Sequence, residues 1–425
     1  MIGLGAYLQV LRQNRELPLF GFTTSFSSSF GQTFFIGVFS PTIQAEFALS
    51  HTAWATIYLF GTLASALVLP WTGKKIDRVP LALYAGCVWG LLAIACLTFS
   101  LATAPLGLVL GIFLLRQSGQ GLMSHLSLTT MARFFDRTRG RAIAIATLGF
   151  AVGEALLPLI AVTALAWIGW RWSYRGAAVL VVLLAIPAFY LLARGRTKLA
   201  IEPRASSNDG AGPSSPETET TGWTRGEVLR DTRFYLLLPG LLCPSVVITA
   251  MFFHHLNLAD LKGWTHEWVT GCYVLYAAAA TLTSLVAGQL VDRFGAVKVV
   301  PATLLPQAVG LLFIAGFNSS FALLPYLVLI GVTTGISHTV VAALWAELYG
   351  VAHIGSIRSL AAALSVFGSA LGPVSMGTLM DLGLSAEAVC VAFAIYCLAG
   401  TVLIWIALFH FKSPRALRHK GTTSI

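Results

Sequence analysis

The chain has 425 residues, of which 56% are hydrophobic and only 10% are charged, and its formal net charge is +10. Soluble globular domains carry roughly 25% charged residues, so this composition excludes a soluble protein. The basic residues are scattered between apolar segments and form no continuous stripe, which argues against nucleic acid as a partner.

A helix needs about 20 mostly apolar residues to cross a bilayer, and twelve segments approach or exceed that length. A backbone inside lipid must satisfy its own hydrogen bonds, and these segments lack the alternation of barrel strands, so we expect helices. The sequence therefore predicts an all-α membrane protein in contact with a lipid bilayer. The predicted spans are 17–39, 53–71, 81–102, 105–128, 142–165, 176–193, 234–253, 268–291, 297–317, 321–346, 359–380 and 386–411.

The distribution of Lys and Arg predicts the orientation of the chain. When the N-terminus is placed in the cytoplasm, all but four of the 27 Lys and Arg residues fall on the cytoplasmic side. Cytoplasmic segments of membrane proteins are enriched in these residues, so we expect both termini in the cytoplasm and the chain in the cell (inner) membrane. The four exceptions are Arg116, Arg171, Arg175 and Lys262.

A polar segment between spans six and seven divides the chain. Residues 203–222, PRASSNDGAGPSSPETETTG, have the Pro-, Ser-, Thr- and Gly-rich composition of a disordered linker. Just after it, Thr224 and Glu227 have the spacing of a capping box, which predicts a short helix before span seven. The predicted parts are an N-terminal six-helix half (1–196), a cytoplasmic linker (197–232), a C-terminal six-helix half (233–412) and a cytoplasmic tail (413–425).

Two charged residues lie deep within predicted spans, Arg116 in span four and Glu154 in span five. At 1.5 Å per residue both reach roughly the middle of the membrane, and consecutive helices are usually neighbours, so we expect the two charges to face each other or a shared cavity. A central Arg costs about 2.5–3.5 kcal/mol on insertion scales, which argues against lipid exposure. Gln120, four residues after Arg116 on the same helical face, would supply a hydrogen bond.

Three interpretations of these two charges remain open. The pair is a structural brace between helices, or Arg116 receives a substrate carboxylate through its fork of donors, or Glu154 carries a coupling proton. The second and third are compatible, because an anion and a proton that move together leave little net charge buried.

The two halves of the sequence repeat each other. GKKIDR (73–78) after span two corresponds to GQLVDR (288–293) after span eight, and the segments around His125 and Pro158 correspond to those around His338 and Pro373. Internal repeats are typical of secondary transporters, which bind substrate between the halves near mid-membrane.

Over essentially its full length the chain resembles the major facilitator superfamily, whose loop motif after helices two and eight is G-x-x-x-D-R. The resemblance implies twelve helices in two pseudo-symmetric halves that alternate access to a central site. It also implies that Asp77, Arg78, Asp292 and Arg293 help to latch the cytoplasmic side. Pro80 stands where the family prefers Gly.

In this family helices one, four, seven and ten line the cavity, so their polar residues become candidates for substrate contact. His254 and His255 end span seven at the expected outer surface, where they would bind substrate or sense external pH. His125 and His338 lie nearer the cytoplasm and are expected to pack or bond at the inner gate. The candidates for substrate contact are Gln32, Arg116, Gln120, His254, His255, Asn257 and His338.

The segment FFDRTRGRAIAIATLGFAVG (134–153) is similar to the start of helix five in the monocarboxylate-transporter branch. That resemblance implies proton-coupled transport of a small organic anion, and we expect the chain to act as a monomer. The first span lacks the acidic, Gly-rich signature of that branch. Gly149 and Gly153 also match a motif of drug–proton antiporters, but Glu154 stands where that motif has Pro.

Two further functions remain as alternatives: proton-driven efflux of amphipathic compounds, and a membrane sensor that does not transport. The sequence contains no Walker loop, zinc-binding His-Glu helix, nucleophile elbow or dinucleotide fingerprint, and none of its six Cys residues has C-x-x-C spacing. We therefore expect no enzymatic activity, no cofactor and no metal.

Overall fold

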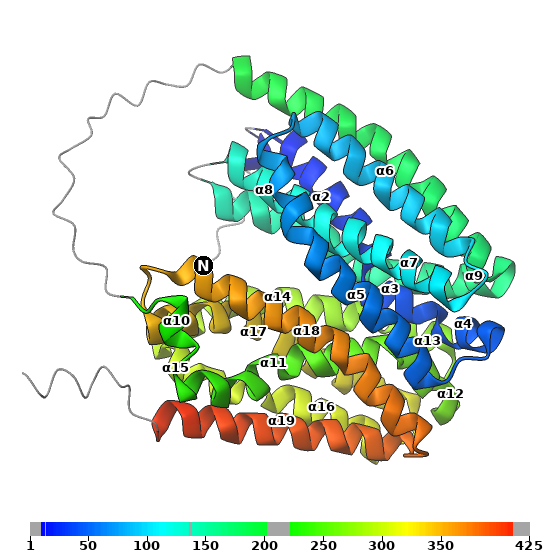
Figure 1. The fold of residues 1–425 in the computed structure, drawn as a ribbon, viewed down its shortest axis with the longest axis vertical. Helices are drawn as coiled ribbons and strands as arrows, with labels where there is room; N and C mark the ends of the chain where they lie inside the picture. The colour runs from blue at the N-terminus through cyan, green and yellow to red at the C-terminus, as the bar shows by residue number, and fades with distance from the viewer. Residues whose placement is uncertain (1–9, 13, 136–137, 202–221, 411–425) are drawn as a thin grey trace, which may run out of the picture. The chain divides into compact units, whose positions relative to one another are not determined.

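The computed structural model describes residues 10–12, 14–135, 138–201 and 222–410, and these residues are almost entirely helical (Figure 1). They contain no β-strand, only an isolated bridge between Gly222 and Gly350. The helices before residue 202 are α2 (Glu16–Ser28), η1 (Ser29–Gly31), α3 (Thr33–Ile36), η2 (Gly37–Phe39), α4 (Ser40–Phe47), α5 (His51–Gly73), η3 (Lys74–Asp77), α6 (Leu81–Ser100), α7 (Pro105–Leu115), η4 (Arg116–Met123), α8 (Ser124–Phe134) and α9 (Arg139–Ile201).

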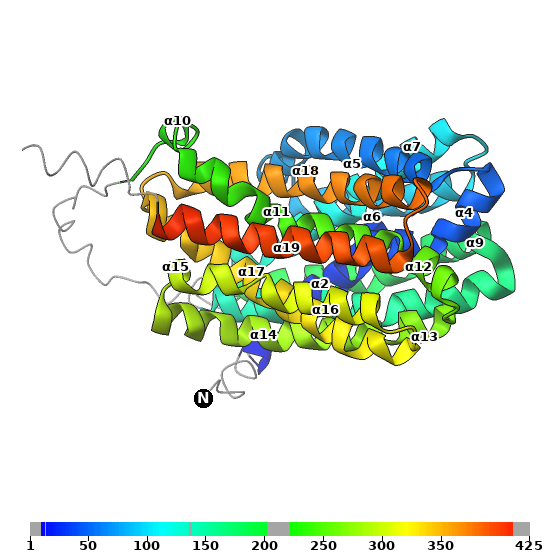
Figure 2. The same cartoon turned by 90° about the horizontal axis from the view of Figure 1, so that it is seen from below.

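The second part of the chain continues the pattern after residue 222, and α16 and α19 lie side by side (Figure 2). Its helices are α10 (Arg225–Val228), α11 (Thr232–Phe253), α12 (His255–Lys262), α13 (His266–Gly271), α14 (Tyr273–Phe294), α15 (Ala296–Val299), η5 (Val300–Ala302), α16 (Leu305–Gly316), η6 (Ser320–Ala322), α17 (Leu323–Tyr349), α18 (Ile354–Asp381) and α19 (Ala386–Phe409).

The all-α membrane fold predicted from the sequence is confirmed. Among the described residues, ten helical stretches are long and apolar enough to cross a membrane. Predicted spans five and six together form α9, which is kinked at Gly169 with φ 72°, a left-handed conformation that favours glycine. Predicted span one is broken into the short helices α2 to α4 and so does not count as one long helix.

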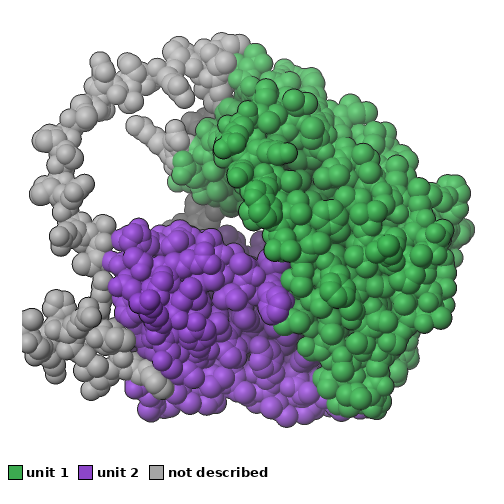
Figure 3. Space-filling model, viewed as in Figure 1, with its two compact units in different colours: residues 1–215, 249–277, 369–384 green, residues 216–248, 278–368, 385–425 purple. Residues whose placement is uncertain are grey.

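The chain forms two compact units (Figure 3). The first unit consists of residues 1–215, 249–277 and 369–384, and the second of residues 216–248, 278–368 and 385–425. The predicted boundaries between the two six-helix halves stay a prediction, and most of the predicted linker, residues 202–221, lies outside the described residues.

Glycines let span one pass between spans four and five in the first unit. A Cβ built on Gly119 would lie 2.6 Å from the Cα of Gly31, so the two backbones touch. On the opposite side, a Cβ on Gly149 or Gly153 would collide with Phe22 or Ser29 of span one. Small residues allow such close approach in membrane bundles, so the glycine pattern of span five has a packing role.

Replacement of Gly31 by Ala is expected to destabilise the protein by about 1–3 kcal/mol, because the new methyl group meets backbone atoms that cannot move aside. Its Cβ would lie 2.8 Å from the Cα of Gly119 and closer still to the carbonyl oxygen of Leu115. The melting temperature of the purified protein in detergent measures the loss. Gly90→Ala on α6 is the matched control, since nothing lies within 4 Å of its Cβ position; equal melting temperatures for both variants would contradict the packing argument.

The first unit also joins segments far apart in the sequence. The Asp381 carboxylate at the end of α18 accepts hydrogen bonds from the backbone N–H groups of His51 (3.1 Å) and Thr52 (2.8 Å) at the start of α5. The Ser40 hydroxyl donates to the carbonyl of Phe253 at 3.0 Å. The start of α5 is thus capped both by Ser50, which accepts from Ala53, and by a carboxylate at its positive end.

A second polar cluster of this unit surrounds Glu46 on α4. The Trp170 indole donates to one carboxylate oxygen at 2.5 Å, and Arg171 donates to the other at 2.5 and 3.2 Å. Partial burial raises the pKa of Glu46, but the bonds from Trp170 and Arg171 outweigh it and hold this pKa below its usual value.

A carboxyl whose pKa is depressed by folding stabilises the protein above its unfolded pKa of about 4.3 and loses that contribution as the pH falls through the folded value. Glu46→Gln is therefore expected to lower the melting temperature at pH 7, and the gap to wild type is expected to close below about pH 4. Melting curves across this pH range measure the effect. Glu267→Gln, which removes an exposed carboxylate on α13, is the control; a gap for Glu46→Gln that is constant with pH would show that the ion pair is not its origin.

In the second unit the predicted capping box is confirmed: Thr224 and Glu227 cap α10 reciprocally. The backbone N–H of Trp223, just before this helix, also donates a hydrogen bond to the backbone carbonyl of Tyr349 at 2.8 Å. Cys243 and Cys397 approach to 3.4 Å between their sulfurs as free thiols. The six cysteines are all free, and five are buried as expected, but Cys87 is exposed on the apolar surface of α6.

Candidate functional site

The candidate site is built where two membrane spans lose regular α-helical geometry. Span one stops being helical at Gln32, which adopts the extended conformation φ −88°, ψ 155°. Span four changes at the same level into a π-helix over Arg116–Met123. The Gly31–Gly119 backbone contact joins the two irregular segments. A π-helical turn, which is wider than an α-helical one, often marks a functional site. A break in a helix also leaves backbone carbonyls that need hydrogen-bond donors.

Arg116 supplies one of these donors. Its side chain is only 1% exposed, and its Nη1 donates to the carbonyl of Gly31 at 3.2 Å and to the Thr33 hydroxyl at 3.4 Å. The guanidinium carbon lies 5.3 Å from the centre of the Tyr58 ring. The negative end of a helix and an aromatic face both favour a cation, so this environment holds Arg116 without a carboxylate.

The hydroxyl groups of Thr33 and Tyr58 extend the hydrogen bonding of Arg116. Arginine can only donate, so Thr33 uses one of its two lone pairs to accept from Arg116, and the Thr33 and Tyr58 hydroxyls share a further hydrogen bond in which either group can donate. The Thr33 and Tyr58 oxygens are 2.5 Å apart.

One edge of the Arg116 guanidinium remains unused within the described part of the chain. Nε is buried and has no hydrogen-bond partner there, and the hydrogen bonds of Arg116 involve Nη1 alone. The Nε–H and Nη2–H groups form the parallel pair of donors that matches the two oxygens of a carboxylate. Buried donors without partners are rare, so this edge is the strongest ligand-binding feature of the site.

Glu154 is also buried, at 8% exposure, but it does not pair with Arg116. None of the ion pairs or hydrogen bonds of the described residues joins these two side chains, so direct pairing, one of the two arrangements expected, is not formed, and a shared cavity stays a prediction. The physical reason is the position of span one, whose residues 22–31 pack against Gly149 and Gly153 on one side and Gly119 on the other. The brace interpretation loses its support, because neither charge stabilises the other directly.

Gln120 departs from the expected hydrogen bond to Arg116, whereas the substrate contact expected of Gln32 stays a prediction. Gln120 makes no hydrogen bond to Arg116, because in a π-helix the backbone bonds run to residue i+5 and the i+4 side chain no longer stands above the first. Gln32 is buried, at 8% exposure, and marks the helix break itself; its carbonyl accepts from Phe35 and Ile36.

The residues after span seven are not at an exposed interface. His254 and His255 are 0% and 1% exposed because α12 continues the helical packing beyond α11. His254 Nε2 lies 3.0 Å from the carbonyl of Pro373, and His255 Nδ1 lies 2.9 Å from the Tyr273 hydroxyl. Asn257 donates to Gln44 at 2.6 Å. The expectation of surface histidines is therefore wrong, and the roles of these three residues in substrate contact stay predictions.

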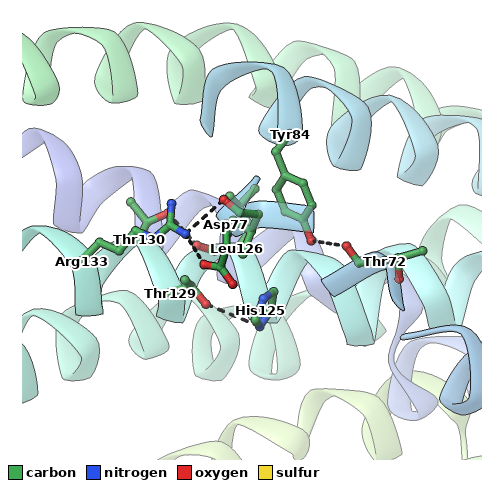
Figure 4. Close-up of polar contacts among 9 residues, drawn as sticks. Thr72, Asp77, Tyr84, His125, Leu126, Thr129, Thr130 and Arg133 are labelled. Carbon is green, nitrogen blue, oxygen red and sulfur yellow. Dashed lines mark hydrogen bonds and ion pairs between the residues drawn. The ribbon is translucent and has the colours of Figure 1, made fainter. Parts of the chain in front are cut away.

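The first loop motif forms an ion pair, but not within itself (Figure 4). Asp77 points toward Arg133 at the end of α8, whose Nη2 also donates to the carbonyl of Ile76 at 3.0 Å. His125 Nδ1 lies 3.4 Å from the Thr129 hydroxyl. Asp77 thus ties the loop after span two to the end of span four, whereas Arg78 is exposed.

The second loop motif has different geometry. Gly295 has φ 78°, which suits glycine alone, whereas Pro80 in the first copy has φ −52°. Glu347 accepts from the N–H groups of Ala296 (2.7 Å) and Val297 (3.1 Å), so a carboxylate caps the short helix α15. Arg293 packs over Phe294 at 5.1 Å. The gating roles of Asp292 and Arg293, and the role of His338 on α17, stay predictions.

Sequence reasoning missed Gly31, Thr33, Tyr58 and Tyr273. The run SSSFGQT (27–33) carried a signal for the first two, since five polar residues and a glycine interrupt an apolar span. Tyr58 and Tyr273 resemble other aromatic residues of the spans and gave no such signal. The described residues contain no group of three or more His, Cys, Asp or Glu that would hold a metal.

Comparisons with known proteins agree with this architecture. The sequence matches the Major Facilitator Superfamily over residues 21–282 and 265–424. The MFS-type transporter pynF of Aspergillus niger (strain ATCC MYA-4892 / CBS 513.88 / FGSC A1513) is 22% identical over 322 residues, 75% of this chain and 68% of that protein.

Two solved structures share the fold. The crystal structure of the nucleoside transporter NupG has a TM-score of 0.72 and 13% identity, covering 94% of this chain and 100% of NupG. A bacterial homologue of the human lysosomal transporter Spinster, in an inward-facing and occupied conformation, has a TM-score of 0.64 and 15% identity, covering 94% and 97% of the two chains. Together with the sequence match over most of its length, these likenesses show that the chain belongs to the Major Facilitator Superfamily and has its transporter fold.

Proposed function

We propose that this protein is a secondary active transporter that moves a small organic anion, a monocarboxylate, together with a proton by alternating access. The observation that carries the proposal is the unused Nε/Nη2 edge of the buried Arg116. The transporter fold is common to substrates of many chemistries, so the substrate class is argued from this side chain alone.

A carboxylate bound at this edge would complete the environment of Arg116. Its two oxygens would accept from Nε–H and Nη2–H, while Nη1 stays bonded to Gly31 and Thr33. The negative charge of the ligand would balance a guanidinium that has no carboxylate partner among the described residues. The Tyr58 ring, whose centre lies 5.3 Å from the guanidinium carbon, would border the same region.

Glu154 would carry the coupling proton. A buried carboxyl without a partner favours its neutral form, whereas water on either side of the membrane lets it ionise. Taking up a proton together with the anion keeps the net charge that crosses the low-dielectric centre small. The proposal places the monomeric chain in the cell membrane with both termini in the cytoplasm, where the Lys- and Arg-rich loops would lie.

Efflux of amphipathic compounds is the second candidate, because an aromatic cavity lies in the same unit. Its volume is about 150 Å³, and Phe30, Phe35 and Phe39 of span one line it together with residues of α9. Its lining is almost wholly apolar, so it would hold the apolar part of a molecule and give no affinity for an anion.

An uptake screen distinguishes the two functions. Purified protein in liposomes is given radiolabelled lactate, pyruvate or benzoate with the outside more acidic than the inside, or a lipophilic cationic dye with the inside more acidic, which is the gradient that would drive its uptake by antiport. We expect saturable uptake of at least one carboxylate that a protonophore abolishes. Transport of the dye with no carboxylate uptake would support efflux, and ligand binding without any flux would identify a sensor.

A further inference from the structure

An aromatic stack borders the Arg116 site within the first unit. The Phe253 ring at the end of α11 packs against Tyr58 with centroids 4.7 Å apart, and it stacks on Trp54 at 5.5 Å and an angle of 23°. The Tyr58 ring lies 5.3 Å from the guanidinium carbon of Arg116. Trp54, Tyr58 and Phe253 are all 0% exposed. A continuous series of contacts thus runs from Phe253 to the guanidinium.

In the predicted orientation the stack lies on the outer side of Arg116. α5 enters the membrane from the outside, and Trp54 and Tyr58 lie three and seven residues past its first residue, or about 4.5 and 10 Å along the helix. Arg116 lies eleven residues past the outer start of α7, or about 16 Å along. Phe253 is the last residue of α11, which runs outward. From the outside inward the chain therefore presents Trp54 and Phe253 first, with Tyr58 between them and the guanidinium.

Backbone contacts fix the end of α11 against the first span at this level. A Cβ built on Gly37 would lie 2.3 Å from the carbonyl oxygen of Phe252 and 3.0 Å from the Cα of Phe253, so η2 and α11 touch through their backbones. The Ser40 hydroxyl accepts from the Trp54 indole at 2.8 Å and donates to the Phe253 carbonyl at 3.0 Å. The position of the Phe253 ring is therefore set by contacts of its own backbone.

The start of α5 is joined at the same level to two later segments of the chain. A Cβ on Gly377 of α18 would lie 2.8 Å from the carbonyl carbon of His51, and Asp381 caps the same turn of α5. Asn257 donates to Gln44 at 2.6 Å. All of these contacts join the predicted N-terminal half to the predicted C-terminal half. The hydrogen bonds among them exchange for bonds to water at small net cost, so the closure is reversible.

We propose that Phe253 is the outer gate of the substrate site and closes the route from outside by packing over Tyr58 and Trp54. The inference rests on the proposed function, in which Arg116 binds the substrate anion. Alternating access requires the two predicted halves to part on the outer side, which withdraws Phe253 with α11 while Trp54 and Tyr58 stay on α5. When the halves close again, the apolar ring excludes water from the guanidinium, and its bonds to a carboxylate become stronger in the lower dielectric.

Thiol labelling next to Arg116 tests the gate without any transport. Thr33→Cys is introduced into the full-length protein, and intact cells are treated with a membrane-impermeant thiol reagent. Mass spectrometry reads the labelled fraction at residue 33, so the native cysteines stay in place. Phe253→Ala in this background should raise the labelling rate at least about tenfold, which corresponds to about 1.4 kcal/mol. Phe253→Leu keeps a large apolar side chain and should label at least about threefold more slowly than Phe253→Ala.

Phe252→Ala is the matched control, because the same truncation is made one residue earlier. The Phe252 ring packs against Tyr273 and Tyr276, at 4.9 Å from each, and its loss should leave the labelling rate at the wild-type value. Gly37→Ala tests the gate with the Phe253 ring intact, since the new methyl group meets the backbone of α11. It should also speed labelling, and size-exclusion profiles and melting temperatures establish that every variant is folded.

Two outcomes would overturn the gate. One is a wild-type labelling rate in both Phe253→Ala and Gly37→Ala. The other is an equal increase in Phe252→Ala and Phe253→Ala, because any truncation at the end of α11 would then loosen the bundle.

Carboxylate uptake by the same gate variants, with Thr33 restored, separates the gate from the proposed function. Phe253→Ala should lower kcat more than it raises KM, because Arg116 remains but the outer side closes less often. If the wild type takes up no carboxylate while Phe253→Ala still speeds labelling, the proposed function fails and the outer closure stands. If the wild type takes up carboxylate while the gate variants label at its rate, only the gate falls.

Discussion

Arg116→Lys is expected to lower kcat/KM for carboxylate uptake by about 10- to 100-fold. Lys keeps the positive charge but cannot present two parallel donors, and each charge-assisted hydrogen bond is worth about 1.5–3 kcal/mol, where 1.4 kcal/mol is a factor of ten. Initial rates of uptake into liposomes, measured over a range of substrate concentrations, give the two kinetic constants separately. The loss should appear in KM at least as strongly as in kcat, because the missing bond forms already with bound substrate.

Arg175→Lys is the control for this substitution. Arg175 packs over the ring of Trp172 at 4.4 Å on α9, a contact that a Lys side chain can keep. It should retain uptake within about twofold of wild type. Near-wild-type uptake by Arg116→Lys would mean that the guanidinium fork does not bind the substrate, and the anion specificity proposed for this protein would have to be abandoned.

Glu154→Gln is expected to separate transport from the proton gradient. The amide has nearly the shape of the carboxyl but binds no proton at neutral pH, so a pH gradient should no longer drive accumulation. In wild type a difference of one pH unit supports at most about a tenfold concentration ratio for one coupled proton, because one unit equals 1.36 kcal/mol. The ratio in Glu154→Gln should be about one, while exchange of labelled for unlabelled substrate continues.

Glu387→Gln, which changes a carboxyl in the first turn of α19, serves as the control and should accumulate substrate like wild type. Both measurements use the same liposomes with and without a pH gradient. Accumulation by Glu154→Gln at the wild-type ratio would show that the proton travels on another group.

Hydropathy predicted the membrane helices well because it reflects the free energy of transfer from water to lipid, to which every residue of a span contributes. Among the described residues, ten helical stretches account for eleven of the twelve predicted spans, because α9 contains both span five and span six. The kink at Gly169 lies between these two spans, as their predicted separation requires. Span one was predicted as a single helix but breaks at Gln32. Mean hydropathy is averaged over a whole span and does not depend on the conformation of one residue, so it did not reveal the break.

The candidate site was predicted in part. The burial of Arg116 and Glu154 followed from the cost of charges in lipid, but their pairing assumed that consecutive helices touch. Chain order does not say which third helix enters between two neighbours, and here the first span does so through glycine contacts at Gly119 and Gly149. Local signals were more dependable: the capping box of Thr224 and Glu227 involves only neighbouring atoms, and it formed as predicted.

The π-helix of span four has a consequence for the length of the chain. A wide turn of this kind takes up one extra residue without turning the helix that follows, since each residue of an α-helix would otherwise add about 100° of rotation. Ser127 therefore still reaches the carbonyl of Gly21 at 2.8 Å, and Arg133 still reaches Asp77. Deleting one residue between 116 and 123 would relax the turn to an ordinary helix with the cytoplasmic half in phase. An insertion there would swing both contacts to the wrong side.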